Sequence, residues 1–267
     1  MQILDGKVAR AHYTEELIKK IKSFSFVPCL VIIQVGNRVD SDTYIKAKKS
    51  FAQKIGVKVI HIKLDDNVKQ IEIIEIIKKY NNDKTVNGII VQLPLPTHLN
   101  ADEIINTIDP NKDIDGLTNN TKFIPATARG VKELLEFYKI ELKNKKVTVL
   151  GRSNIVGKPT ALMCEREGAI VTVCHSKTEN VSDKTKTADI VIVAIGKPHL
   201  INESYLSKGQ IIIDIGITKE GESLNGDVDF ERVKDIVSMI TPVPGGVGQM
   251  TVLALFENLI DSCYNGL

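Results

Sequence analysis

The sequence predicts an α/β protein with two domains, and three observations support this. Apolar runs of strand length alternate with segments of helical periodicity, a pattern typical of parallel sheets covered by helices. The 267 residues exceed what one hydrophobic core usually serves, and the 43% of apolar residues can fill two cores. A loop-like stretch at residues 109–129, rich in Asp, Asn, Thr and Pro, separates two series of strands. We therefore expect a domain boundary near residue 120.

The first domain is expected to span residues 1–120. Its apolar runs predict strands at residues 29–35, 57–64 and 88–93. Its helical periodicity predicts helices at residues 41–55 and 68–80. This alternation is the pattern of a parallel sheet with crossover helices.

The second domain is expected to span residues 121–247 and begins with a helix near residues 131–138. A second series of strands follows, at residues 147–150, 170–174, 190–195 and 211–215. After the segment TPVPGGVGQMT, a last helix at residues 248–267 presents one apolar face. That face must pack on another element, and the first domain is one candidate.

The amino-acid composition indicates which classes of partner and which cellular compartment to expect. Lys and Arg number 35 against 33 Asp and Glu, a net charge of +2, which lacks the basic surplus of a general nucleic-acid binder. The four cysteines show no C-x-x-C spacing, which indicates buried thiols in a reducing compartment. No run approaches the roughly 18 to 20 apolar residues that span a bilayer. We expect a soluble cytoplasmic protein with no membrane or nucleic-acid partner and no metal site.

A glycine-containing loop predicts a dinucleotide site in the second domain. Gly151-Arg152-Ser153-Asn154-Ile155-Val156-Gly157 follows the strand KVTVL and precedes a helix predicted from residue 159 to 166. A side chain at Gly151 would block the tight turn, and one at Gly157 would hinder contact between helix and strand. The helix N-terminus offers free N–H groups to a pyrophosphate. The alternative is a turn that joins strand to helix without any ligand.

The end of the next strand bears on the choice of cofactor. Cys174-His175-Ser176-Lys177 stands where NAD-specific folds usually carry a ribose-binding carboxylate. Its absence favours NADP, whose 2'-phosphate would find donors at Arg152, Ser176 and Lys177, although these residues also suit an ordinary polar loop. Ala194 and Gly196 follow the third strand of this series, at the edge where open α/β sheets bind ligands.

Four polar residues in the first half carry candidate chemistry. Tyr44 and Lys48 are four residues apart on a predicted helix and share one face. Gln92 lies at the end of a buried strand where two prolines stop the sheet, and Asp115 lies in a loop. Each of these residues is unremarkable by itself.

Together these segments resemble the bifunctional methylenetetrahydrofolate dehydrogenase/cyclohydrolase family. The matching motifs occur in family order between residues 41 and 251: SDTYIKAKKSFAQKIG, GIIVQLPLP, DPNKDIDG, GRSNIVGKP, HSKT, ADIVIVAIGKP, IIIDIGI, NGDV and TPVPGGVGQMT. Several such motifs in order are highly specific.

The resemblance implies an activity, a cofactor and a set of site residues. The activity is NADP-dependent oxidation of 5,10-methylenetetrahydrofolate to 5,10-methenyltetrahydrofolate, followed by hydrolysis to 10-formyltetrahydrofolate. Lys48 is the implied catalytic lysine, Gln92 its partner, Tyr44 a ring against the folate and Asp115 the pterin anchor. The implied cofactor residues are Gly151, Arg152, Ser153, Ile155, Val156, Gly157, His175, Ser176, Ala194, Gly196 and Ile217. Folate contacts are further implied at Pro244, Gly245 and Gly246.

The family also implies a homodimer, a last helix that packs on the substrate domain, and a cleft between the domains. Two features depart from its usual pattern. Ala126 and Ala128 stand in a segment that usually reads P-C-T-P-x-G, and Gln249 stands where proline is usual, which we expect to loosen the turn before the last helix.

These residue types suit the implied reaction. Hydride loss leaves a cation stabilised by two nitrogens, so that step needs alignment more than acid–base help. Hydrolysis needs a free amine, and burial together with the cationic intermediate would lower the pKa of Lys48. Gln92 orients that amine without adding a charge that would favour the ammonium form. Asp115 can accept hydrogen bonds from the pterin donors.

Two other functions fit parts of the sequence. Tyr-x-x-x-Lys also occurs in short-chain dehydrogenases, but there the pair follows the glycine loop within one domain. A non-catalytic NADP-binding regulator could keep the fold without turnover.

Overall fold

The computed structural model describes residues 1–221 and 223–265. It divides into two compact units, each formed by segments that are distant in the sequence. Unit 1 comprises Met1–Ala11 and Thr127–Thr251, and unit 2 comprises His12–Ala126 and Val252–Leu267. Both are α/β structures with parallel sheets, so the predicted fold class is confirmed.

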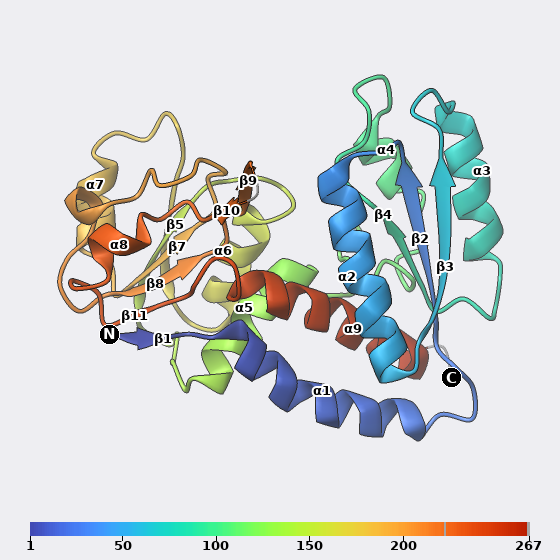
Figure 1. The fold of residues 1–267 in the computed structure, drawn as a ribbon, viewed down its shortest axis with the longest axis horizontal. Coiled ribbons are helices and arrows are strands. Elements are labelled where there is room, and N and C mark those ends of the chain that lie inside the picture. Colours follow the sequence, from blue (N-terminus) through green and yellow to red (C-terminus); the bar gives the residue numbers. More distant parts are fainter. Residues whose placement is uncertain (222, 266–267) are drawn as a thin grey trace. The chain divides into compact units, whose positions relative to one another are not determined.

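Unit 2 is built on a parallel three-stranded sheet in the order β3-β2-β4 (Figure 1). The strands are β2 (Cys29–Val35), β3 (Lys58–Leu64) and β4 (Gly88–Val91). The helices are α2 (Val39–Ile55), α3 (Gln70–Asn81) and the short α4 (Ala101–Ile105). All three strands and the two longer helices were predicted, with bounds that differ by at most two residues.

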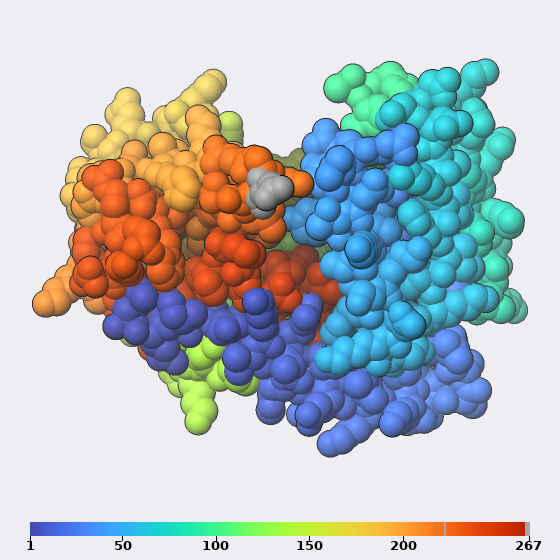
Figure 2. Space-filling model, viewed as in Figure 1, coloured from blue at the N-terminus to red at the C-terminus, as the bar shows by residue number. Residues whose placement is uncertain are grey.

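The side chains along β2 point alternately to the two faces of this sheet. Cys29, Val31, Ile33 and Val35 pack into one apolar cluster that includes Ile73 and Ile77 of α3. The other face is covered by α2 and by the last helix, α9 (Val247–Asn265), whose rings Phe51 and Phe256 lie 5.4 Å apart. β3 is one of the two outer strands of this sheet, and the cyan residues of β3 and α3 lie on the surface in Figure 2.

Unit 1 is built on a parallel six-stranded sheet in the order β1-β11-β8-β7-β5-β6. Its strands are β1 (Gln2–Ile3), β5 (Lys146–Leu150), β6 (Ile170–Cys174), β7 (Ile190–Val193), β8 (Ile211–Asp214) and β11 (Met239–Ile240). Its helical segments are α5 (Ala126–Phe137), α6 (Gly157–Arg166), α7 (Val181–Lys186), η1 (Glu203–Tyr205) and α8 (Phe230–Val233). A hairpin of β9 (Thr218–Glu220) and β10 (Ser223–Asn225) completes the unit.

The N-terminus corrects the expected domain boundaries. Residues 1–11 were placed in the first domain, but β1 pairs with β11 through Gln2 and Met239. Helix α1 (Gly6–Lys22) then runs from unit 1 into unit 2. This connection was not predicted because a two-residue strand is too short to show any periodicity.

Other bounds also differ from expectation. Helix α5 starts at Ala126, five residues before its predicted start at residue 131. Helix α9 starts at Val247, and residues 266–267 of the predicted last helix lie outside the described residues. Within the described part of the chain, no helix is long and apolar enough to cross a membrane.

The last helix packs on unit 2, as predicted. Leu259 Cδ1 would lie 2.8 Å from a Cβ at Gly88, so the absence of a side chain there lets α9 approach β4 closely. Ser262 Oγ donates to Asn87 O at 2.8 Å. The fully buried Asn258 donates from Nδ2 to Ile114 O at 2.8 Å and to Ile124 O at 3.0 Å. Asn258 thereby fixes both ends of the loop that contains Asp115.

We expect Asn258→Ala to destabilise unit 2, because two buried carbonyl groups lose their donor at a cost of about 1–3 kcal/mol. A thermal melt followed by circular dichroism measures this loss. Asn82→Ala is the matched control, since it removes an exposed bond to Lys78 O. An equal change in melting temperature for both variants would contradict the role given to Asn258.

Candidate active site and dinucleotide loop

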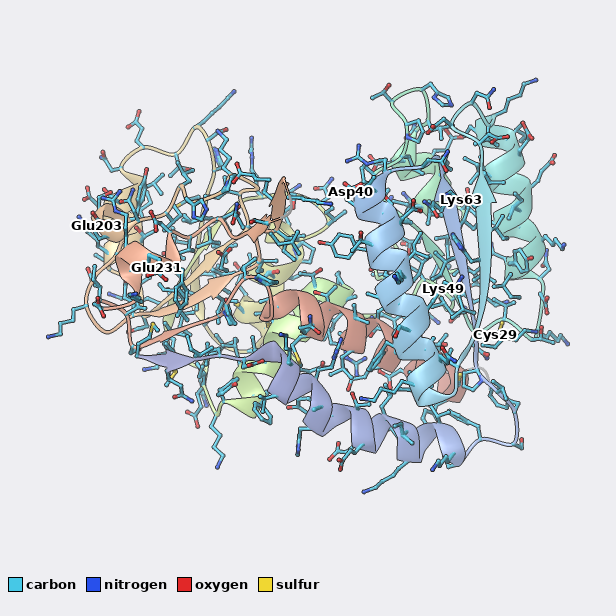
Figure 3. All side chains as sticks on the ribbon, in the orientation of Figure 1. Cys29, Asp40, Lys49, Lys63, Glu203 and Glu231 are labelled. Carbon is cyan, nitrogen blue, oxygen red and sulfur yellow. The ribbon has the colours of Figure 1, made fainter. Side chains whose placement is uncertain are left out.

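The polar site of unit 2 begins with the placement of α2. Asp42 in its first turn accepts a hydrogen bond from Gln34 Nε2 at 2.7 Å, and Gln34 is fully buried on β2. Lys63, labelled in Figure 3, donates to the same Asp42 oxygen from β3 at 3.1 Å. These bonds tie the start of α2 to the carboxyl ends of two strands, and Tyr44 and Lys48 follow on the next turns.

Lys48 and Gln92 form a direct hydrogen bond. Lys48 is buried, with 8% of its surface exposed, and its Nζ donates to Gln92 Oε1 at 2.9 Å. The Gln92 amide N–H donates to Ile33 O at 2.8 Å, which continues the strand pairing beyond β4. Gln92 Nε2 donates to Leu93 O at 2.9 Å, so the side-chain oxygen faces the lysine.

A network of backbone hydrogen bonds shapes the loop around Asp115. The neighbouring Asp113 is buried, and its carboxylate accepts from the amides of Gly116, Leu117 and Thr118 at 3.1, 3.2 and 2.8 Å. Asp115 O accepts from the amide of Ala126 at 3.1 Å. Because Asp113 takes up these amide donors, the Asp115 carboxylate is left for other contacts.

Burial sets the electrostatics of this site. Burial lowers the pKa of Lys48, and the Asp115 carboxylate opposes that change. Burial likewise raises the pKa of Asp115, against the effect of Lys48 and with a further increase from Asp113. The pKa of Tyr44 is raised by burial and by Asp40, although 40% of the residue is exposed. The structure thus brings Lys48, Gln92 and Asp115 into one electrostatic group, with Tyr44 one turn away on the Lys48 helix.

The glycine loop of unit 1 has the strand–turn–helix form that the sequence predicted. A Cβ at Gly151, whose φ is +116°, would lie 2.1 Å from Ala194 O, and one at Gly157 would lie 2.3 Å from Gly151 O. Neither position therefore tolerates a side chain. Helix α6 begins at Gly157, two residues before its predicted start.

Ser153 caps the start of α6. Its Oγ accepts from the amides of Val156 and Gly157 at 3.2 and 3.3 Å. Arg152, Ser153 and Ile155 are exposed in this loop. The loop therefore combines an exposed rim with close backbone packing, which suits an anionic ligand.

The residues after β6 form a compact turn. His175 Nδ1 accepts from the Lys177 amide at 3.1 Å, and Thr178 Oγ accepts from the His175 amide at 2.9 Å. Ser176 and Lys177 are both exposed. The described residues of this turn include no carboxylate at the position that NAD-specific folds usually use.

Two buried carboxylates, Asp214 at the end of β8 and Asp227 after β10, accept hydrogen bonds from the turns after β7 and β8. Asp227 accepts from the amides of Ile195 and Gly196, and Asp214 accepts from the amide of Gly216. Asp227 belongs to the motif NGDV, which indicates only a polar turn when read by itself. Ile217, a predicted cofactor residue, follows at the end of the β8 turn and is 36% exposed.

The turn at Pro244, Gly245 and Gly246 belongs to unit 1. Gly245 O accepts from the Gly6 amide at 2.9 Å, and a Cβ at Gly246 would lie 2.6 Å from Pro242 O. The Gln249 amide donates to Gly246 O at 3.1 Å, a bond that proline at this position could not form.

Unit 1 also has exposed ion pairs. Glu203 and Glu231, labelled in Figure 3, pair with Arg232 and Lys234. Exposed pairs of this kind contribute little to stability. We assign them no role in the site.

Fold and site together define a nicotinamide-dependent dehydrogenase with a second polar site in a separate unit. Two family models match the chain. Residues 4–115 match the catalytic domain of tetrahydrofolate dehydrogenase/cyclohydrolase, and residues 125–266 match its NAD(P)-binding domain. The chain belongs to the tetrahydrofolate dehydrogenase/cyclohydrolase family.

Individual relatives agree with this assignment. The chain is 42% identical to the bifunctional protein FolD of Agathobacter rectalis, over 97% of this chain and 98% of that protein. The crystal structure of the bifunctional FolD dehydrogenase/cyclohydrolase from Campylobacter jejuni matches with a TM-score of 0.96, 42% identity and full coverage of both chains. The Trypanosoma brucei enzyme, solved with NADP and an inhibitor, matches with a TM-score of 0.92 and 32% identity, over 98% of this chain and 97% of that one.

Proposed function

We propose that this chain oxidises 5,10-methylenetetrahydrofolate with NADP to 5,10-methenyltetrahydrofolate and hydrolyses that product to 10-formyltetrahydrofolate. The observation that carries the proposal is the buried Lys48 amine, hydrogen-bonded to the neutral Gln92. Family membership supports both activities, because the named relatives are bifunctional dehydrogenase/cyclohydrolases.

The dinucleotide loop fits NADP. The exposed loop at residues 152–155 would receive the pyrophosphate at the positive end of α6, where the Val156 and Gly157 amides already donate to Ser153 Oγ. Exposed donors at Arg152, Ser176 and Lys177 would hold the 2'-phosphate, with His175 in the same turn as Ser176 and Lys177. When bound, NADP supplies the acceptor for the electrons that leave the folate methylene carbon. The chain's own contribution to this step is alignment, because the cation formed is stabilised by the folate nitrogens.

Hydrolysis uses Lys48 as a base. Water attacks the methenyl carbon while one of its protons passes to Nζ. The bond from this carbon to N5 then breaks as the new hydroxyl loses its proton and N5 takes up a proton, which leaves the formyl group on N10. A lysine can accept the first proton only as the free amine, and burial lowers its pKa in that direction. The neutral amide of Gln92 orients the amine without a charge that would favour the ammonium form.

Asp115 and Tyr44 would bind the folate. The Asp115 carboxylate can accept hydrogen bonds from the pterin amino group and ring N–H. Burial raises its pKa, and the nearby Lys48 opposes that rise. Tyr44 offers a partly exposed ring for stacking. We extend the folate site to Pro244, Gly245 and Gly246 on the strength of the family pattern.

One assay tests the proposal as a whole. Purified protein is mixed with 5,10-methylenetetrahydrofolate and either NADP or NAD, and reduced nicotinamide and methenyl absorbance are followed together. We expect turnover, with a preference for NADP. Dinucleotide binding without turnover of either folate would instead support a non-catalytic regulator.

Lys48→Met is expected to abolish hydrolysis of 5,10-methenyltetrahydrofolate, because methionine fills the space of the side chain but cannot take up a proton. NADP binding, measured by calorimetry, should not change, since the dinucleotide loop lies in unit 1. Lys49→Met is the matched control, because Lys49 is the exposed neighbour on α2 (Figure 3). Wild-type hydrolysis by Lys48→Met would end the assignment.

Gln92→Glu is expected to move the pH dependence of hydrolysis to higher pH. A carboxylate next to Lys48 would raise the pKa of the amine, so a larger fraction would be protonated at a given pH. Asp115→Asn should have the opposite effect, because the Asp115 carboxylate raises the pKa of Lys48 in the wild type. The measurement is kcat for methenyl-folate hydrolysis against pH, corrected for the spontaneous reaction. Shifts in the same direction for both variants would contradict the role of Lys48.

We also propose a cytoplasmic homodimer that forms through β6. The four cysteines are free and buried, which suits a reducing compartment. β6 is an edge strand of the unit 1 sheet, and Ile170 and Val173 are 61% and 38% exposed on it. An open apolar edge invites pairing with a second copy of the same strand.

Ile170→Lys is expected to yield monomers, because a charge on this edge opposes pairing with a second copy. Analytical ultracentrifugation of the wild type should give twice the 29.5 kDa chain mass. Ile71→Lys, at an exposed site on α3, is the control and should stay dimeric. A monomeric wild type would refute the dimer, and a dimeric Ile170→Lys would exclude β6 as its interface.

A further inference from the structure

Unit 1 contains a buried pair of carboxylates that the proposed chemistry does not use. Asp214 ends β8 and is 3% exposed, and Asp227 lies after the β9–β10 hairpin and is fully buried. Buried carboxylates cost free energy unless strong hydrogen bonds compensate. The hydrogen-bond partners of Asp214 and Asp227 therefore indicate which part of the fold these carboxylates stabilise.

Asp227 holds the turn that follows β7. Its Oδ2 accepts from two consecutive amides, Ile195 at 2.6 Å and Gly196 at 2.8 Å. Bonds from amides to a carboxylate are stronger than neutral ones. A Cβ at Gly216 would lie 2.1 Å from Asp227 Cγ, so the glycine makes room for the carboxylate.

The turn held by Asp227 packs against the glycine loop. Ala194 donates from its amide to Leu150 O at 2.8 Å, and Ala194 O lies where a side chain at Gly151 would be. The position of residues 194–196 therefore sets the space available to the first residue of the dinucleotide loop. A shift of this turn would change the loop without any change in the loop sequence.

Asp214 in turn holds Asp227. The Asp214 carboxylate accepts from the amides of Gly216, Asp227 and Val228 at 2.9, 3.2 and 2.9 Å. Burial, with a smaller contribution from Asp227, raises the pKa of Asp214 to about 7. The pair thus links the turns after β7 and β8 to the segment at residues 226–228.

We propose that Asp227 is a positioning residue for NADP: it holds the turn at residues 194–196 against Gly151 and thereby keeps the dinucleotide loop open to the cofactor. This inference rests on the proposed dinucleotide site. It adds a residue that would have no contact with the cofactor and would act through the Ile195 and Gly196 amides.

The test compares two substitutions at this position. Asp227→Ala removes both acceptor contacts and is expected to raise the Kd for NADP, measured by calorimetry, by about tenfold or more, as expected when a binding loop loses its preorganisation. Asp227→Asn keeps an acceptor oxygen of the same shape and should bind NADP within about threefold of the wild type. Methenyl-folate hydrolysis should stay within about twofold in both variants, because Lys48 and Asp115 lie in unit 2.

Asp229→Ala is the matched control. Asp229 also accepts from a backbone amide, that of Arg232 at 3.3 Å, but it caps α8 and does not hold the turn at residues 194–196. It should lower the melting temperature and leave NADP binding unchanged. If Asp227→Ala does not fold, Asp227→Ser replaces it in the test. Serine keeps a polar group but is too short to reach both amides, so we expect the same rise in the Kd for NADP.

Two results would overturn the inference. One is an unchanged Kd for NADP in Asp227→Ala or Asp227→Ser. The other is a parallel loss of NADP binding and hydrolysis in the alanine and asparagine variants alike, which would indicate a general structural role. Failure of the wild type to bind NADP would instead refute the proposed function.

Discussion

The hydrogen bond between Lys48 Nζ and Gln92 Oε1 is the interaction on which the chemistry of this structure depends. It requires α2 and the end of β4 to lie side by side, and the α2 start is fixed by Gln34 and Asp42. Burial lowers the pKa of the amine, and the amide partner does not reverse that effect. A carboxylate at the position of Gln92 could accept the same hydrogen bond, but it would raise the pKa of the amine.

The two proposed sites differ in their electrostatics, although both are built on parallel α/β sheets. In unit 2, burial next to a neutral partner lowers the pKa of Lys48. In unit 1, the proposed anion site is the exposed glycine loop, and Asp227 holds two amides of the neighbouring turn. Parallel sheets suit both tasks, because strand ends and helix N-termini gather at one edge.

The sequence predicts the elements that are long enough to show a period. The strands β2, β5 and β6 and helices α2 and α3 were all found near their expected bounds. The pairing of β1 with β11 could not be found, because each has two residues and their partners are set by tertiary contacts. Asn258 and Asp227 were missed for a related reason: their partners are backbone groups far along the chain, which leave no local pattern.

Asp115 and Lys48 each change the pKa of the other. Asp115 raises the pKa of Lys48 while Lys48 lowers that of Asp115, so each opposes the effect of burial on the other. A cationic folate bound between them would favour the ionised carboxylate and the neutral amine together. The substrate itself would then complete the charge balance, and the base would be most available when the carbon to be attacked is present.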